Sequence, residues 1–366
     1  MNVLIVEASS HTKVLENVYH LLKSKCSLTF YLNDFGRGKD DLFLLFPSAS
    51  EVQLITNRFH DATFFIWLLF YGRKYDYINI STGPETSYFS QIFNIIFFSI
   101  CCFVYREKII LTVKNTRPYL RSTGGFFAFL RSKSIKNLKR FTFESQTQRD
   151  YFIKCADIKT RCLGVSYDRY SDLLDSQFYY PSERLPSDPV RIGLLGTISC
   201  DRRDYKVIIA ALKQMSSEER SSITFVTLAG FRGEDSNEII GELSEYVKID
   251  DYQKKRILSA HEFDVRGASC HLLISPLTKK YGYGKFKGSG SFGDAAYLRR
   301  KIILPSYVDD DGEFADISLY YRDIDDLLNI FKNIKELAKA ELEPQCFERF
   351  KTDNVFTRLV NDLELC

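Results

Sequence analysis

The stretch KGSGSFGDAAYLRRKIILP, residues 287–305, combines residue types that bind anions. Its glycines let the backbone approach a ligand closely, and its serines add hydroxyl groups that donate hydrogen bonds. Asp294 and the small residues after it are expected to begin a short helix, whose free N–H groups favour phosphate. We therefore predict a phosphate site formed by Ser289, Gly290, Ser291, Phe292, Gly293 and Asp294.

Basic residues gather in two predicted loops of the same half of the chain. One pair precedes the glycine-rich turn, and the other follows a predicted strand that ends in Gly-Thr. If both loops lie at one edge of a sheet, they converge on a point where a diphosphate would be stabilised. The alternative is that the lysines are only solvated and the glycines only make turns. The residues concerned are Gly196, Thr197, Arg202, Arg203, Lys285 and Lys287.

Three known motifs can be tested against the spacing of this turn. GSGSFG matches the G-x-G-x-x-G dinucleotide fingerprint, but the fingerprint follows its strand directly, whereas residues 278–287 separate this turn from the strand before it. An NAD(P)-dependent oxidoreductase is therefore kept as an alternative function. A Walker A loop is excluded because the turn contains no G-K-[ST], and a serine-hydrolase elbow because no G-x-S-x-G frame fits Ser289 or Ser291.

The composition is that of an ordinary globular protein. The 366 residues are 45% hydrophobic, which is enough for two domains with cores of their own. The net charge of +3 is too small for a nucleic-acid binder, so no nucleic acid is expected as a partner. The nine cysteines show no zinc spacing, and MNVLIVEASS lacks the basic region of a signal peptide, so we expect reduced thiols in a cytoplasmic protein.

Apolar strands alternate with helices along the first half of the chain. The apolar stretches Thr63–Tyr71 and Phe89–Tyr105 are expected to be buried helices rather than membrane spans. This alternation predicts a mostly parallel sheet that is covered on both faces. The predicted strands are NVLIVEA, SLTFYL, DLFLLF, VQLIT, YDYINIS, KIILTVKN, FTFES and a segment around 160–165.

A second alternating set follows a proline-containing linker. The expected strands are VRIGLLGTIS, SITFVTLAG, YVKID, HLLISPL and KIILP, and an amphipathic helix closes the chain at 354–365. We predict an α/β protein with two doubly wound, Rossmann-like domains, whose ligands bind at the carboxyl ends of strands. The domains are expected at 1–166 and 190–345, with the linker at 167–189 and a C-terminal helical segment at 346–366.

The second half resembles the nucleotide-sugar-binding domain of GT-B glycosyltransferases, of the glycogen-synthase-like, family 4 type. The resemblance rests on IGLLGTISCDRRDY, TFVTLAG, HLLISPL and GSGSFGDAAYLRRKIILP, in this order. It implies two Rossmann-like domains facing each other across a cleft, with the terminal helix crossing back to the first domain. It also implies transfer of a sugar from a nucleotide-diphosphate donor to a glycan or lipid-linked glycan, in surface polysaccharide biosynthesis.

The resemblance also implies roles for individual residues. Gly196 and Thr197 would line the phosphate pocket, Arg202 and Lys287 would neutralise the leaving diphosphate, and the turn at 291–293 would present N–H groups to it. Asp294 would either cap its helix or bind ribose.

One position departs from the pattern of the family. Many retaining members carry two glutamates seven residues apart in this region, but the position of the first is occupied by Phe286, so we leave the stereochemistry open. Asp309–Asp311 are not interpreted as a metal-binding D-x-D signature, because a solvated turn after the strand is enough to explain them. No metal and no other cofactor is expected, because cationic side chains and a helix dipole can stabilise the leaving group.

An inverting transfer needs a general base from the first domain. His11 follows the first strand and can act as a base at neutral pH, with a surface histidine as the alternative reading. Glu85, in STGPE, is the second candidate, and its alternative role is to stabilise the start of the next helix. Asn115, at the end of KIILTVKN, and Arg117, just after it, are expected to bind the acceptor.

Aromatic residues make up 14% of the chain, and core packing accounts for most of them. The remainder suits a face that binds a sugar or a lipid-linked acceptor, because aromatic rings stack on pyranoses and settle at membrane interfaces. Peripheral contact with the inner face of a membrane is therefore a further expectation. A non-catalytic, phosphate-binding interaction protein of the same fold is the third alternative function.

Overall fold

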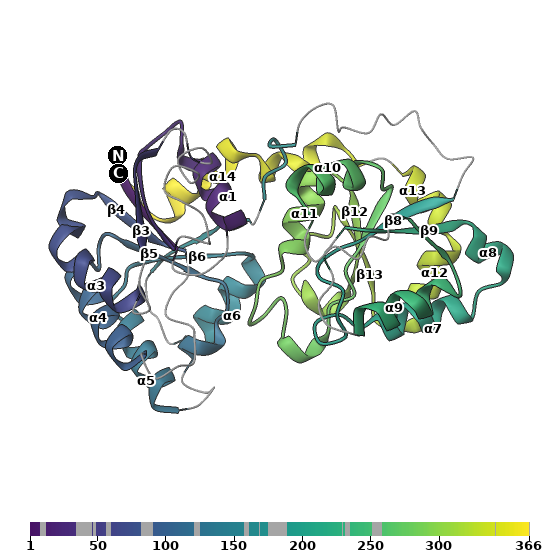
Figure 1. Ribbon diagram of the computed structural model, residues 1–366, viewed down its shortest axis with the longest axis horizontal. Coiled ribbons are helices and arrows are strands. Elements are labelled where there is room, and N and C mark those ends of the chain that lie inside the picture. The colour runs from purple at the N-terminus through teal and green to yellow at the C-terminus, as the bar shows by residue number, and fades with distance from the viewer. Residues whose placement is uncertain are drawn as a thin grey trace. The chain divides into compact units, whose positions relative to one another are not determined.

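The computed structural model describes residues 1–7, 12–33, 46, 49–55, 60–81, 91–120, 125–156, 161–167, 169–174, 189–228, 230, 235–250, 258–340 and 342–365. The chain forms two compact units (Figure 1). Unit 1 consists of Met1–Asp168, Lys285–Gly288 and Thr352–Cys366, and unit 2 of Arg169–Gly284 and Ser289–Lys351.

Unit 1 is built on a sheet of seven parallel strands in the order β3-β2-β1-β4-β5-β6-β7. The strands are β1 (Asn2–Glu7), β2 (Ser27–Asn33), β3 (Ala49–Ile55), β4 (Tyr77–Ile80), β5 (Ile109–Val113), β6 (Arg140–Phe143) and β7 (Cys162–Val165). Val3 of β1 pairs with Leu28 of β2 and with Tyr77 of β4, so the strand order reverses between β1 and β4. Such a reversal leaves a crevice at the carboxyl ends of the two strands, where ligands of open α/β sheets bind.

Helices connect the strands of unit 1 and cover both faces of its sheet. They are α1 (Thr12–Leu22), α3 (His60–Tyr71), α4 (Gln91–Val104), α5 (Gly125–Ile135), α6 (Gln146–Ala156) and α14 (Thr352–Asp362). Helix α4 contacts both α3 and α5, whereas α14 contacts α1 and β7 (Figure 1). Because right-handed crossovers in opposite directions lie on opposite faces, α3, α4 and α5 share one face and α1 lies on the other.

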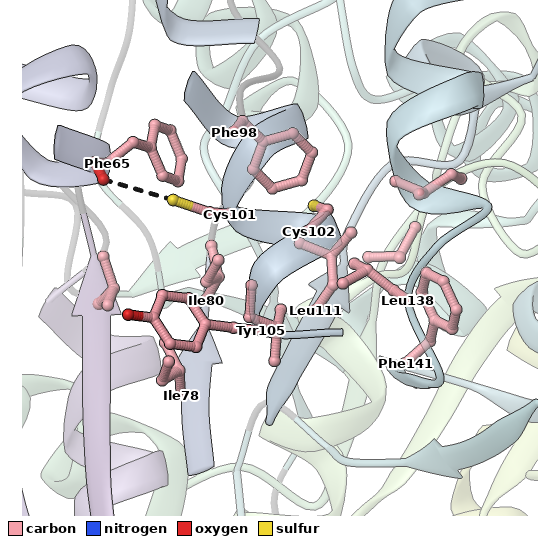
Figure 2. Close-up of a cluster of buried hydrophobic side chains, with 14 of the residues drawn as sticks. Phe65, Ile78, Ile80, Phe98, Cys101, Cys102, Tyr105, Leu111, Leu138 and Phe141 are labelled. Atoms are coloured by element: carbon pink, nitrogen blue, oxygen red, sulfur yellow. Dashed lines mark hydrogen bonds between the residues drawn. The ribbon is translucent and has the colours of Figure 1, made fainter. Parts of the chain in front are cut away.

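The core of unit 1 is packed mainly from aromatic and aliphatic side chains (Figure 2). Two adjacent thiols of α4 lie within it, and Cys101 Sγ donates to the carbonyl of Phe65 at 3.3 Å. Burial raises the pKa of Cys101 to about 12 and raises that of Cys102 well above its ordinary value, so both thiols stay protonated. All eight cysteines in the described part of the chain are free.

Unit 2 is built on six parallel strands in the order β10-β9-β8-β11-β12-β13. The strands are β8 (Val190–Leu194), β9 (Ile223–Thr227), β10 (Lys248–Asp250), β11 (Leu272–Ile274), β12 (Lys301–Pro305) and β13 (Ser318–Tyr321). The helices are α7 (Tyr205–Lys213), α8 (Ser217–Ser221), α9 (Asp235–Ser244), α10 (Ala260–Ala268), α11 (Gly290–Leu298), α12 (Ile324–Lys332) and α13 (Ile334–Lys339). The strand order reverses between β8 and β11.

The predicted fold class is confirmed, since both units are doubly wound parallel sheets. The sequence did not predict α5, β13 or α12, and the predicted strand DLFLLF lies outside the described residues except for buried Phe46. Of the predicted linker, residues 169–174 belong to unit 2, where Ser171 donates its N–H and its hydroxyl to backbone carbonyls of η7 (Pro344–Phe350). Within the part of the chain that the structure describes, no helix is long and apolar enough to cross a membrane.

His271 makes the stability of unit 2 depend on pH. Its Nδ1 accepts the backbone N–H of Arg191 at 2.9 Å, and burial, with the charges of Arg300 and Arg191, lowers its pKa to about 4. In the unfolded chain the same imidazole takes up a proton near pH 6.5. The neutral, buried His271 therefore contributes its full share to the free energy of unfolding above that pH, and this share is lost as the pH falls towards 4. The limit is about 1.4 kcal/mol per pH unit, reduced by solvent screening.

We expect His271→Asn, whose side-chain oxygen can accept the same N–H, to flatten this loss in urea unfolding followed between neutral pH and pH 4. The exposed His261→Asn is the control and should keep the wild-type slope. Equal slopes in both variants would show that His271 does not titrate with folding.

Candidate functional site

The carboxyl ends of β8 and β11 are held together at the point where the strand order of unit 2 reverses. Leu195 N–H donates to the carbonyl of Ile274 at 2.9 Å. The loop after β8, residues 195–204, is the β8 loop, and residues 275–284 are the β11 loop. Thr278 N–H donates to the carbonyl of Arg202 at 3.1 Å, so the two loops are also bonded to each other.

The start of α11 lies at the same edge of the sheet. Ser291 Oγ donates to Ser275 Oγ at 2.8 Å in a buried contact, which fixes the first turn of the helix to the end of β11. The helix begins at Gly290, earlier than predicted, and the side chain of Ser289 accepts the N–H of Ser291 as its N-cap. The β8 loop and the first turn of α11 are therefore both bonded to the segment that ends β11.

Gly196 and Arg203 together form the framework of the β8 loop. Gly196 has φ +76°, and a Cβ at this position would lie 1.7 Å from Arg203 Nη2. Arg203 is buried, and its Nε donates to the carbonyl of Leu195 at 3.2 Å. Arg203 therefore positions the loop, whereas the side chain of Arg202 is exposed and Thr197 beside it is half-buried.

Asp294 lies inside α11 and forms an ion pair. Arg169 Nε is 2.8 Å from Asp294 Oδ1, and the Arg169 guanidinium stacks over the rings of Phe263 and Tyr297. The N-cap of the helix is Ser289, so the helix-capping role proposed for Asp294 is wrong. Its carboxylate instead ties α11 to Arg169.

The exposed end of the β8 loop also carries a carboxylate. Asp201 Oδ1 is 3.1 Å from Lys280 Nζ, and hydrogen bonds from Tyr281 and Lys280 lower the pKa of Asp201. The ion pair joins the β8 loop to the β11 loop at their exposed ends. The carboxylate also opposes the binding of an anion close to Lys280.

Asp309 does not belong to a solvated turn, contrary to our reading of the sequence. It is buried, and its carboxylate accepts the backbone N–H groups of Glu313 and Phe314, both at 2.9 Å, and the hydroxyl of Tyr320. Its function is to fold the loop after β12. Among the described residues, no three His, Cys, Asp or Glu side chains gather as a metal-binding group.

The segment Lys285–Gly288 belongs to unit 1, where its backbone pairs with the residues after β5. Thr116 donates its N–H and its hydroxyl to the carbonyl of Phe286 at 2.7 and 3.1 Å, and Lys287 forms an antiparallel bridge with Asn115. The predicted donor residues Lys285 and Lys287 are thus brought next to the predicted acceptor residues Asn115 and Arg117.

Phe286 anchors this segment. Its ring packs against the ring of Tyr151, with centroids 4.8 Å apart, and under the guanidinium of Arg117 at 4.6 Å. Position 286, at which many retaining glycosyltransferases carry a glutamate, is therefore occupied here by a phenylalanine that serves packing.

Two residues near this segment were missed in the sequence. Buried Gln148 accepts the N–H of Glu144 at 3.1 Å and donates to the carbonyl of Lys114 at 3.0 Å, so it joins the ends of β5 and β6. A Cβ on Gly288 would lie 1.8 Å from Glu144 Oε2, which shows how closely this carboxylate approaches the segment. The sequence signal that could have found Glu144 was its place in FTFES, directly after the predicted strand.

The two predicted bases cannot be placed. His11 and Glu85 both lie outside the described residues. Two fully buried polar residues lie where the strands before them end. Glu7 is the last residue of β1 and Ser81 follows β4, and Ser81 N–H donates to the carbonyl of Val6 at 2.9 Å. These residues flank the reversal of the strand order in unit 1.

Comparisons with solved structures show chains of the same architecture. HepE of Anabaena, solved in complex with UDP, is 12% identical over 100% of both chains, with a TM-score of 0.67. A glycosyltransferase of Rickettsia africae is 11% identical over 100% of this chain and 99% of that one, with a TM-score of 0.59. A putative UDP-N-acetylglucosamine 2-epimerase of Listeria monocytogenes is 9% identical over 99% of this chain and 95% of that one, with a TM-score of 0.59.

No family model and no curated protein sequence matches the chain. At the identities found for the solved structures, the likeness shows the fold alone, and it agrees with the two Rossmann-like sheets described above. The chain has the two-domain fold of the GT-B type.

The fit between Gly196 and Arg203 can be tested by adding one methyl group. Gly196→Ala places a Cβ at a positive φ and against the Arg203 guanidinium, so we expect it to lower the free energy of unfolding by about 1–3 kcal/mol. Gly241→Ala, in α9, is the control, because its Cβ would meet no atom within 4 Å and alanine favours helix. Urea unfolding that gives the same loss for both variants would contradict the assignment.

Proposed function

We propose that this chain is a glycosyltransferase that takes a sugar from a nucleotide-diphosphate donor and transfers it to a glycan or lipid-linked glycan acceptor. The observation that carries the proposal is the bonded arrangement of the β8 loop, the β11 loop and the start of α11 at the strand-order reversal of unit 2. The solved structures with UDP, and with UDP and glucose, support a nucleotide-sugar ligand.

The chemistry of the donor follows from this edge of the sheet. In the transfer, the bond between the sugar carbon and the diphosphate oxygen breaks, and negative charge develops on the diphosphate. Exposed Arg202 and the N–H groups in the first turn of α11 supply positive charge and hydrogen-bond donors for that charge. We assign the same function to Lys287 and no role to a metal ion.

The acceptor and the base are assigned to unit 1. Asn115 and Arg117 follow β5 and are the proposed acceptor-binding residues, with Arg117 held by Phe286. For an inverting transfer the base would be His11 or Glu85, and Glu144 is added as a third candidate because it is a half-buried carboxylate at the end of β6. Surface polysaccharide synthesis is proposed as the pathway on the basis of the family resemblance.

The alternative of an oxidoreductase finds less support in the geometry. β11 ends at Ile274 and α11 begins at Gly290, so GSGSFG does not follow its strand directly as the dinucleotide fingerprint requires. The turn that does follow its strand at the reversal is the β8 loop with Gly196.

The donor site predicts a charge-dependent loss of nucleotide binding in Arg202→Ala. A hydrogen bond to a charged group contributes about 1.5–3 kcal/mol, so we expect the affinity for the preferred nucleoside diphosphate to fall about tenfold to a hundredfold. Calorimetric titration of UDP, GDP, dTDP and NADH into the wild type first identifies the preferred nucleotide, and the variant is then measured with it.

Lys248→Ala is the control for Arg202→Ala, because it removes an exposed cation at the amino end of β10 in the same unit. Its affinity should equal that of the wild type. A wild type that binds NADH and no nucleoside diphosphate would overturn the proposed function in favour of the oxidoreductase. A wild type that binds the nucleotide but leaves a donor sugar unhydrolysed and untransferred would favour the non-catalytic protein.

The base can be identified by removing each candidate without changing its shape. Of His11→Asn, Glu85→Gln and Glu144→Gln, we expect one to lower kcat by about a hundredfold or more, because general base catalysis contributes about 10²–10⁴. Nucleotide affinity should be unchanged in all three. A sugar-transfer assay with product analysis makes the measurement, and full activity in every variant would show that none of these residues is the base.

A further inference from the structure

Unit 1 exposes apolar side chains on one side of its sheet. Among the described residues, nine of the twelve exposed large apolar side chains lie on α3, α4 and α5. We call this surface the apolar face and define it by Phe70 and Tyr71 of α3, Ile100 and Phe103 of α4, and Phe126 and Phe129 of α5. Phe70 is 75% exposed and Phe103 is 68% exposed, which is far from the usual position of phenylalanine.

Helix α4 shows that the apolar face is formed by apolar residues on the side of the helix opposite the core. In α4, Ile96, Ile100 and Phe103 recur at helical spacing on the outside, whereas Phe98 and Cys102 pack in the core. Surface helices normally carry polar residues on the side opposite the core. Helices α3, α4 and α5 pack side by side (Figure 1), so we expect their outer stripes to lie on the same side of unit 1.

Basic residues lie in the last turns of the same three helices or directly after them. We call Arg73, Lys74, Arg106, Lys133 and Lys136 the basic rim, and we leave out Lys108, whose Nζ donates to the carbonyls of Arg73 and Tyr75. In the stretches 60–74, 91–108 and 125–137, seven Lys or Arg residues stand against the two acids Asp61 and Glu107, while the whole chain is nearly balanced at 50 to 47. The excess of positive charge is therefore specific to this part of unit 1.

Aromatic residues with polar groups lie where the apolar face meets the basic rim. Trp67 stacks on Tyr71, with ring centroids 5.2 Å apart, and Lys74 Nζ lies 5.9 Å from the centre of the Trp67 ring. Tryptophan and tyrosine beside lysine are typical of surfaces at the level of lipid headgroups, where one end of a side chain is apolar and the other is wet.

We infer that the apolar face and its basic rim form a docking surface for a lipid bilayer that contains anionic lipids. The apolar side chains enter the boundary of the acyl chains, and the rim is attracted to the negative headgroups. A second copy of the chain fits less well, because the same surface of that copy carries the same excess of basic over acidic residues and offers no opposite charge to the rim. The inference uses no residue of the proposed donor site.

The test is cosedimentation of the full chain with vesicles. We expect binding to vesicles of equal parts phosphatidylcholine and phosphatidylglycerol, weakening as salt is raised, and at least about tenfold weaker binding to phosphatidylcholine alone. Trp67 is the single tryptophan of the chain, so its fluorescence should shift to shorter wavelength on binding. Equal binding to both kinds of vesicle, or none to either, would overturn the inference.

The double variant Phe70→Ser/Phe103→Ser tests the apolar face itself. Burial of one phenylalanine contributes about 1.5–3 kcal/mol, so vesicle affinity should fall at least about tenfold, with melting temperature and nucleotide affinity unchanged because both side chains are exposed. Ile153→Ser/Val265→Ser, which removes two exposed apolar residues elsewhere, is the matched control and should bind as the wild type does.

Two results would contradict the proposal. One is an unchanged vesicle affinity in Phe70→Ser/Phe103→Ser. The other is a wild-type dimer in light scattering without vesicles that this variant converts to a monomer, because the face would then be covered by a second copy. If the variant fails to fold, Arg106→Glu/Lys133→Glu takes its place, and binding to the anionic vesicles should then fall at least about tenfold.

Discussion

The backbone hydrogen bond from Leu195 to Ile274 sets the geometry on which the proposed donor site depends. It joins the carboxyl ends of β8 and β11, the two strands between which the strand order of unit 2 reverses. Neighbouring loops at such a reversal diverge and leave an open edge, which is why open α/β sheets bind ligands there. In unit 2 the two loops at this edge are joined by the hydrogen bond from Thr278 N–H to the carbonyl of Arg202, which fixes the backbone of each loop relative to the other.

The buried cation Arg203 fixes the conformation of the β8 loop. Arg203 is buried against Gly196 and donates to the carbonyl of Leu195, so its charge is used for the loop itself. Arg202, its neighbour in sequence, is exposed. Of these two adjacent arginines, Arg203 therefore holds the backbone of the loop, and Arg202 is the one that we propose to meet the diphosphate. A buried cation bonded to carbonyls also favours an anion nearby, because its charge is only partly neutralised.

The segment Lys285–Gly288 shows how backbone pairing can override the position of residues in the sequence. Its lysines precede the helix of unit 2, yet its carbonyl and N–H groups bond to the residues after β5 of unit 1. Gly288 allows the approach of Glu144, and the next residue, Ser289, caps α11. A larger residue at 288 would act on the start of α11 through the chain itself.

Sequence reasoning recovered the periodic features of the molecule and missed those that depend on pairing. The strands NVLIVE and KIILP were predictable because short apolar runs between helices imply buried parallel strands. The roles of Arg203 and Asp294 were not, because the partner of each, Gly196 or Arg169, is recognised only once the loop or helix is placed. Glu144 was overlooked because a strand-end carboxylate has no periodic signature, although its position directly after FTF was visible.

Helix α4 shows the same limit of sequence-based prediction. Its sequence reads as a buried helix because both of its sides are apolar, and only the sheet topology shows that one side faces outward. An outward apolar stripe is costly in water and is typical of interaction surfaces. The apolar face also comes near the proposed acceptor-binding residue Arg117, since exposed Phe126 lies in the first turn of α5, and α5 contacts η2 (Arg117–Tyr119). In the proposed function, a lipid-linked acceptor held in a bilayer at the apolar face would lie on the same unit as Arg117, the proposed acceptor-binding residue.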